Sequence, residues 1–221
     1  MILFFLCIYI SKQSGYATTV LIKLGLKEPV AQINWCQLGW NNSLEQLNYD
    51  SDIIFFGDSI TYNGDYQEEF SSYKIVNLGY PGDTLDNMLQ RSSVISSLTP
   101  EKIFILAGIN GLTDNSINDS FVKYDSLISS IAESNPNAEI FIESLLPIST
   151  YKESAYCSNN SIIEFNNLLK IYCSKNRYTY VDLYSLYVSD GSMIEEYTKD
   201  GIHLKPEYYR FWYDKLSEYI N

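Results

Sequence analysis

The feature that most constrains the fold is a repeated pattern: a short apolar run, a turn, and then an amphipathic stretch. Five runs have the length of buried strands, at residues 53–56, 74–78, 102–107, 139–145 and 178–183. Apolar positions three and four residues apart predict helices over residues 84–97, 121–132, 161–175 and 206–220. Strands that alternate with helices of this length pair in parallel through right-handed crossovers. The pattern therefore predicts an α/β fold, a three-layer α/β/α sandwich around a central, mostly parallel five-stranded sheet.

The chain divides into a domain and a lead-in. Residues 51–221 carry the alternating pattern and are expected to form one domain, since a chain of 221 residues can bury one large core. Residues 29–50 are expected to contain a short amphipathic helix near 41–48 that packs on this domain.

Residues 1–28 form a separate apolar segment. Its first run, Ile2 to Ile10, would reach about 14 Å as a helix, well short of the roughly 30 Å of a bilayer core. We favour an export signal or membrane anchor over a helix of the core, although a basic region before the run is missing. The first interpretation predicts an extracytoplasmic protein with possible membrane association through this segment, and the second a cytoplasmic one.

The charge balance limits the partners. Fifteen basic against 27 acidic residues give a net charge of −12, which repels phosphate backbones and anionic membrane surfaces. We therefore expect no nucleic-acid partner. Twenty tyrosines supply aromatic surfaces that suit either ordinary packing or contact with a sugar or acyl group.

The content of cysteine and histidine argues against a metal centre. The four cysteines form no CxxC pair, and His203 is the one histidine of the chain. A zinc site of the usual kind needs more such ligands, so no metal is expected. Two alternatives stay open for the cysteines: free thiols, or a bridge between Cys157 and Cys173 in an exported protein.

Polar residues after three of the strands, and one loop near the end of the chain, provide the groups for acyl transfer. A serine nucleophile needs a base, the base needs an orienting carboxylate, and the oxyanion needs N–H donors. The candidates are Ser59 as nucleophile, His203 as base and Asp200 as its carboxylate, with the N–H groups of Ser59 and Gly82 and the amide of Asn110 as oxyanion donors. Taken singly, Ser59 also suits a helix cap and Asn110 a turn.

Four separated motifs resemble those of the SGNH hydrolases, also called GDSL-like lipases and acylhydrolases. They are Gly57-Asp58-Ser59-Ile60-Thr61, Asn77 to Thr84, Gly108-Ile109-Asn110, and Asp200 to His203. The resemblance covers residues 51–221. It implies the flavodoxin-like fold of that family, a catalytic triad of Ser59, Asp200 and His203, and an oxyanion hole formed by Ser59, Gly82 and Asn110.

One position departs from the family pattern. The family usually has an aspartate directly after the asparagine of the third motif, whereas this chain has Gly111 and reaches its next acid at Asp114. Since that aspartate braces the loop, its absence bears on the geometry around Asn110. Asp58 follows the pattern and is expected to stabilise the turn rather than to act in catalysis.

The resemblance implies a serine esterase that works through an acyl-enzyme without cofactor. Because no long insertion or apolar lid separates the motifs, we expect a small-molecule or glycan ester, with a small acyl group such as acetyl on a carbohydrate. The alternatives are a lysophospholipase or thioesterase type of acylhydrolase, or a catalytically inactive binding module on the same fold. An α/β-hydrolase fits poorly, since Ser59 is not in a G-x-S-x-G motif. No sequence feature predicts the oligomeric state.

Overall fold

A parallel sheet forms the centre of the computed structural model, which describes residues 33–34, 50–153 and 155–220. Its six strands follow the order β1-β3-β2-β4-β5-β6, and every neighbouring pair is parallel. Their bounds are β1 Ile33–Asn34, β2 Ile53–Gly57, β3 Ile75–Gly79, β4 Lys102–Leu106, β5 Glu139–Glu143 and β6 Thr179–Val181. The five predicted strands are thus confirmed. The two-residue β1, which was not predicted, pairs with the outer side of β3.

The strand order indicates at which edge of the sheet a ligand would bind. The five predicted strands run in the order second, first, third, fourth, fifth, which is the flavodoxin-like arrangement. The order reverses between β2 and β4, whose register pairs Ile53 with Lys102 and Gly57 with Leu106. In open sheets of this type, ligands bind beyond the carboxyl ends of the strands at this reversal. Ser59 and Asn110 follow the two strands that flank it.

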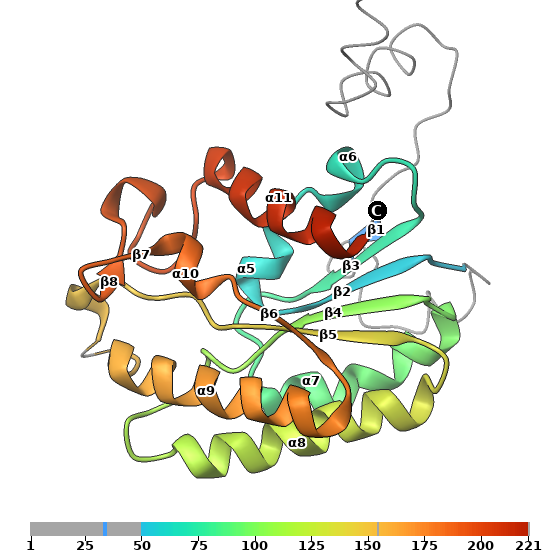
Figure 1. Cartoon of the computed structure of the whole chain (residues 1–221), viewed down its shortest axis with the longest axis horizontal. Helices are drawn as coiled ribbons and strands as arrows, with labels where there is room; N and C mark the ends of the chain where they lie inside the picture. Colours follow the sequence, from blue (N-terminus) through green and yellow to red (C-terminus); the bar gives the residue numbers. More distant parts are fainter. Residues whose placement is uncertain (1–32, 35–49, 154, 221) are drawn as a thin grey trace, which may run out of the picture.

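Helices cover both faces of the sheet and complete the predicted three layers (Figure 1). One face carries α7 Leu85–Arg91, α8 Ile117–Ser134 and α9 Asn159–Asn176. The other carries α5 Ser59–Tyr62, α6 Tyr66–Glu69, α10 Tyr184–Tyr187 and α11 Tyr209–Ile220. The helix predicted over 84–97 is α7 followed by a 3₁₀ helix, η1 Ser92–Leu98, and the last predicted helix begins with the 3₁₀ turn η4 Pro206–Tyr208.

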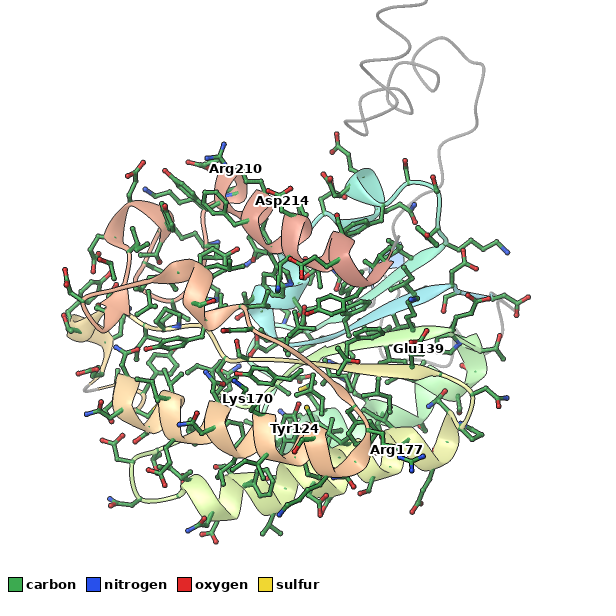
Figure 2. The ribbon with its side chains drawn as sticks, in the orientation of Figure 1. Tyr124, Glu139, Lys170, Arg177, Arg210 and Asp214 are labelled. Atoms are coloured by element: carbon green, nitrogen blue, oxygen red, sulfur yellow. The ribbon has the colours of Figure 1, made fainter. Side chains whose placement is uncertain are left out.

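The helix faces follow the predicted periodicity with two exceptions. On α8 the side chains of Tyr124, Leu127 and Ile131 are buried, and Figure 2 shows Tyr124 on this helix. The apolar spacing predicts that Leu89 and Val122 also face inward on the helices expected over 84–97 and 121–132, but Val122 is 65% exposed and Leu89 37% exposed. A helix of 3.6 residues per turn carries each of them away from the sheet. Charged side chains such as Arg210 and Asp214 are exposed on α11 (Figure 2).

The chain between β6 and α11 forms the loop that carries the fourth motif. It contains a small antiparallel pair, β7 Val188–Ser189 and β8 Ser192–Met193, and the 3₁₀ turn η3 Glu195–Tyr197. An antiparallel bridge between Thr198 and Leu204 then closes the segment that holds Asp200 and His203. This closure fixes the two ends of the loop.

Several predictions fall outside the described residues or stay untested. The apolar segment 1–28 and the lead-in helix near 41–48 lie outside, as do Cys7 and Cys36. Within the described part, Cys157 and Cys173 are buried free thiols, and burial raises the pKa of each to about 12. In the same part, no helix has the length and apolar character needed to span a membrane.

Candidate active site

The nucleophile motif forms a sharp turn from β2 into α5. Ser59 is the first residue of α5, and Asp58 is its N-cap: the Ile60 N–H donates to Asp58 Oδ1 over 2.9 Å. Such a cap satisfies a backbone donor that the helix itself leaves unpaired. As predicted, Asp58 therefore stabilises the turn, and Ser59 stands at the carboxyl end of a central strand.

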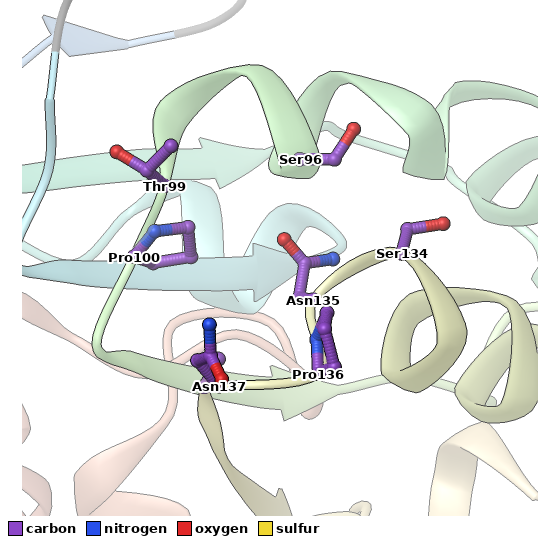
Figure 3. Close-up of a pocket in the computed structure, with 8 residues that line it drawn as sticks. Ser96, Thr99, Pro100, Ser134, Asn135, Pro136 and Asn137 are labelled. Carbon is purple, nitrogen blue, oxygen red and sulfur yellow. The ribbon is translucent and has the colours of Figure 1, made fainter.

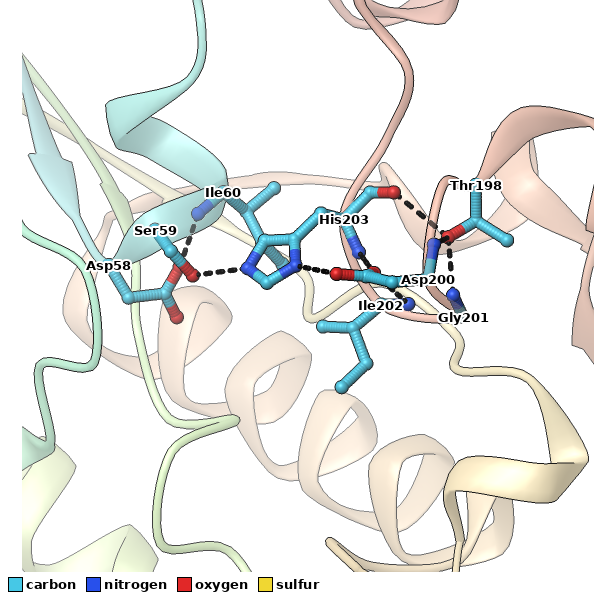
Figure 4. A network of polar contacts seen from close by, with 8 residues as sticks. All are labelled: Asp58, Ser59, Ile60, Thr198, Asp200, Gly201, Ile202 and His203. Carbon is cyan, nitrogen blue, oxygen red and sulfur yellow. Dashed lines mark hydrogen bonds and ion pairs between the residues drawn. The ribbon is translucent and has the colours of Figure 1, made fainter.

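The structure brings Ser59, His203 and Asp200 into one hydrogen-bonded chain (Figure 4). Ser59 Oγ lies 2.8 Å from His203 Nε2, and His203 Nδ1 lies 2.7 Å from Asp200 Oδ2. The His203 ring is thus held between the Ser59 hydroxyl and the Asp200 carboxylate, although Ser59 and His203 are 144 residues apart in sequence. This is the geometry in which an imidazole can take a proton from a serine while a carboxylate stabilises the resulting imidazolium.

Hydrogen bonds within the 198–204 loop hold the imidazole in place. Asp200 Oδ1 accepts from the backbone N–H groups of His203 and Ile202 at 2.8 and 3.1 Å. Thr198 Oγ1 donates to the His203 carbonyl and accepts from the Gly201 N–H, both at 2.8 Å. Burial alone would raise the pKa of Asp200, but its hydrogen bonds to the backbone and ring of His203 outweigh burial and lower it. Asp200 is therefore a carboxylate at neutral pH.

The predicted oxyanion donors lie on three neighbouring turns. Gly82 is exposed on the β3–α7 turn, with open space where a side chain would stand. Asn110 follows β4, and its Nδ2 donates to the Asp83 carbonyl over 3.0 Å. A side-chain amide has two N–H bonds, so this contact fixes Asn110 and leaves the second for a ligand.

A buried ion pair that sequence reasoning missed joins these turns. Arg91 Nε donates to Asp83 Oδ2 over 2.5 Å, and both side chains are 2% exposed. Arg91 Nη2 also donates to the Gly57 carbonyl over 3.0 Å, and the guanidinium lies 4.3 Å from the ring centre of Phe56. Arg91 stands three residues after the buried Met88, so a basic residue on the inward face of α7 was the available signal.

The same region holds a second buried acid. Asp58 is fully buried, its Oδ2 has no hydrogen-bond partner among the described residues, and burial raises its pKa to about 7. The charge of Asp83 raises this pKa further, whereas the Ile60 N–H and Arg91 lower it. One arginine thus compensates two acidic side chains beneath the Ser59 turn.

Asp114 provides the bracing contacts that the family pattern would assign to an aspartate at position 111. Gly111 has φ +100°, a conformation that disfavours the aspartate usual at this position. Asp114 Oδ1 instead accepts from the Ser158 N–H at 2.7 Å, the Ser158 hydroxyl at 2.9 Å and the Ser161 hydroxyl at 2.7 Å. These bonds lower the pKa of Asp114 and tie the Asn110 loop to the start of α9.

A polar hollow of about 300 Å³ adjoins Asn110 and Gly111 between α7 and α8. Its polar lining includes Thr84, Asp86 and Lys123, and Lys123 forms an ion pair with Asp86 across the two helices. A second hollow lies at the opposite edge of the sheet, where β4 and β5 begin (Figure 3). The first hollow therefore adjoins one candidate site residue, Asn110, and the second lies away from the site.

Among the described residues, no three His, Cys, Asp or Glu side chains gather in a way that could hold a metal ion. The chemistry available at the site is that of the serine, the imidazole, the carboxylate and the N–H donors.

Comparison with known proteins agrees with this geometry. The profile of the GDSL-like Lipase/Acylhydrolase family matches residues 55–211, which include all the candidate site residues. The chain belongs to this family. This family is one of lipases and acylhydrolases, and the arrangement of Ser59, His203 and Asp200 is that of a serine hydrolase.

Three known proteins are similar to this chain. A candidate platelet activating factor from Streptococcus pneumonia is 28% identical, with a TM-score of 0.71, over 81% of this chain and 90% of that one. An acetyl xylan esterase is 19% identical, with a TM-score of 0.63, over 75% of this chain and 98% of that one, and shows the shared fold. The N-acylneuraminate cytidylyltransferase of Streptococcus agalactiae serotype V is 25% identical over 162 residues, 73% of this chain and 37% of that enzyme. The GDSL-type chain thus spans well under half the length of this curated relative.

Proposed function

We propose that this chain is a serine esterase that removes small acyl groups, above all acetyl, from a carbohydrate. The observation that carries the chemistry is the hydrogen-bonded chain from Ser59 Oγ through His203 to Asp200, at 2.8 and 2.7 Å. The three oxyanion donors on adjacent turns complete the set of groups that acyl transfer needs.

The proposed reaction has two halves. Ser59 Oγ attacks the ester carbonyl while His203 Nε2 takes its proton, and the N–H groups of Ser59, Gly82 and Asn110 stabilise the oxyanion. As the tetrahedral intermediate collapses, His203 returns the proton to the leaving alcohol and an acyl-enzyme remains. Water, activated by His203, then attacks the acyl-enzyme and releases the acid. Asp200 stabilises the imidazolium in both halves.

Two observations support a polar substrate. The hollow beside Asn110 is lined largely by polar side chains, among them the charged Asp86 and Lys123. The relatives named above include an acetyl xylan esterase and an enzyme named for N-acylneuraminate, a sugar. Two alternatives stay open: a lysophospholipase or thioesterase activity, and an inactive binding module on the same fold.

The test is a hydrolysis panel of p-nitrophenyl esters from acetyl to palmitoyl beside acetylated xylan. We expect acetyl to be the preferred acyl group and acetylated xylan to be deacetylated. Ser59→Ala should lower kcat by more than about 10³-fold with an unchanged circular dichroism spectrum. Preference for palmitoyl would favour the lipid alternative. A folded protein whose Ser59 is not labelled by a fluorophosphonate would favour the binding module.

We propose in addition that residues 1–28 direct the chain out of the cytoplasm or anchor it to the membrane. The support is the apolar run at the start of the chain. Cell fractionation of the full chain beside a chain that lacks these residues tests the proposal, and equal recovery of both in the cytoplasm would refute it.

A further inference from the structure

One aromatic side chain of the described residues is exposed, and it packs on the loop that carries His203. Tyr151, in the 3₁₀ turn η2 Thr150–Lys152, is 60% exposed, whereas every other described Phe, Tyr or Trp is buried or half-buried. Single exposed apolar residues are common on protein surfaces, so exposure alone assigns no role. The position of this ring supplies the second observation.

Tyr151 packs against the loop that carries His203. A Cβ at Gly201 would lie 2.6 Å from the Tyr151 hydroxyl and 2.7 Å from Cζ, so the ring occupies the space a side chain would need. Gly201 has φ +87°, which glycine adopts without strain. The Ser149 N–H donates to the Gly201 carbonyl over 2.8 Å and fixes the start of η2 to the same loop. Tyr151 is thus packed on the loop that holds the imidazole, and the residue remains 60% exposed.

The chemistry places the leaving group on this side of Ser59. His203 Nε2 must give its proton to the departing oxygen, so the alcohol part of the ester lies next to the imidazole. The oxyanion donors come from the turns after β2, β3 and β4, so the carbonyl oxygen points away from the 198–204 loop. The surface that flanks the departing alcohol therefore includes the loop of His203 and the side chain packed on it.

We infer that Tyr151 is the platform on which the sugar ring of the leaving alcohol lies, an inference that rests on the proposed esterase function. The apolar C–H face of a pyranose matches the face of an aromatic ring. Lys152 Nζ lies over one face of the Tyr151 ring, 5.7 Å from its centre, which leaves the other face for the sugar and provides a charged hydrogen-bond donor for its hydroxyls. The site thus selects a ring-shaped, hydroxylated alcohol through two neighbouring residues of one turn.

The experiment compares two acetyl esters that differ in the alcohol: an acetylated methyl xyloside and ethyl acetate. We expect Tyr151→Ala to lower the ratio of their kcat/KM values by about 3- to 10-fold, mainly through a higher KM for the sugar ester. Tyr151→Phe, which keeps the ring, should restore the ratio to within twofold of the original. Ile171→Ala is the matched control, since Ile171 is an exposed apolar residue (52%) near the end of α9 that leads into β6, at the opposite edge of the sheet.

Three results would overturn the inference, each in a recognisable way. An equal loss of kcat on both esters would mean that Tyr151 acts by supporting the Gly201 turn rather than by binding sugar. An unchanged ratio in Tyr151→Ala, in an enzyme that cleaves both esters, would remove the platform and leave the esterase function standing. If the original protein cleaves neither ester and its Ser59 resists a fluorophosphonate, the proposed function itself fails.

Discussion

Replacing Arg91 with methionine removes the cation of the buried ion pair under the Ser59 turn. Three contacts of the guanidinium disappear: those with Asp83 Oδ2, with the Gly57 carbonyl and with the Phe56 ring. Asp83 and Asp58 are left buried, 3% and 0% exposed, without the charge that faces them both. Removing one partner of a buried pair costs about 3–5 kcal/mol, because the remaining charge is uncompensated. For a domain of this size the melting temperature should fall by about 6–20 °C.

The cost should depend on pH, which separates charge from packing. Burial raises the pKa of Asp83, and Arg91 opposes that rise. Without Arg91 the pKa of Asp83 moves higher. The folded variant therefore binds more protons than the unfolded chain over a wider range of pH. Its free energy of unfolding then falls as pH rises through that range. We expect Arg91→Met to lose the full amount, about 3–5 kcal/mol of unfolding free energy, at pH 8 and less at pH 5, where the carboxyl groups can be neutral.

Urea unfolding followed by tryptophan fluorescence measures both values, since Trp212 is fully buried in α11. Lys123→Met is the matched control: it breaks the exposed ion pair with Asp86 and should cost no more than about 1 kcal/mol at either pH. Arg91→Lys keeps the charge and should recover most of the loss. A cost below about 1 kcal/mol at pH 8, or equal costs at the two pH values, would refute the view that the pair stabilises through charge.

The other predictions concern single side chains. Asn110→Ala should lower kcat by about 10²–10³-fold with less change in KM, as expected for loss of one oxyanion donor; steady-state kinetics with a loss under threefold would make it a turn residue only. Asp200→Asn should lower kcat by up to about 10⁴-fold, since a neutral amide stabilises no imidazolium; single-turnover rates check this, and retained turnover would contradict it. Asp114→Ala removes the brace of the Asn110 loop and should lower kcat by less than Asn110→Ala does, and an unchanged kcat in the same kinetic assay would show that the brace is dispensable. Burial raises the pKa of Glu143 to about 8 from 4.5, so the free energy of unfolding should fall as pH rises between these values. Glu143→Gln should flatten this slope in urea titrations, whereas Glu139→Gln, at the exposed start of the same strand, should not.

Much of the fold could be predicted because local patterns and tertiary structure agree here. Apolar runs such as 53–56 and 102–106 are buried on both faces of a parallel sheet, so they lack the alternation of an exposed strand and stand out in the sequence. The wrong predictions of helix faces were of one kind. Val122 and Leu89 are apolar residues that fit a helical period loosely, and which face they take is decided by the neighbouring helices rather than by the local pattern.

The candidate site also has one part that the sequence predicts and another that it does not. Ser59, Asn110 and His203 could be proposed because each follows a strand or lies in a motif, and parallel strands bring their carboxyl ends to one edge. The contacts that hold them could not be proposed. The bonds from Asp114 to Ser158 and Ser161 span 44 and 47 residues, and no local pattern encodes such pairs. The exposure of Tyr151 depends in the same way on what packs around it.

Three buried acidic residues near the candidate site lower the stability of the domain. Asp58, Asp83 and Glu143 are buried and have raised pKa values, and they lie at or just after the carboxyl ends of β2, β3 and β5. Each costs free energy because burial opposes the charged form. At the other ends of these strands, acidic residues such as Glu139 are exposed. At the edge that holds Ser59, neutral isosteres should therefore tend to stabilise the fold where the acid has no partner cation, and destabilise it where Arg91 is left unpaired.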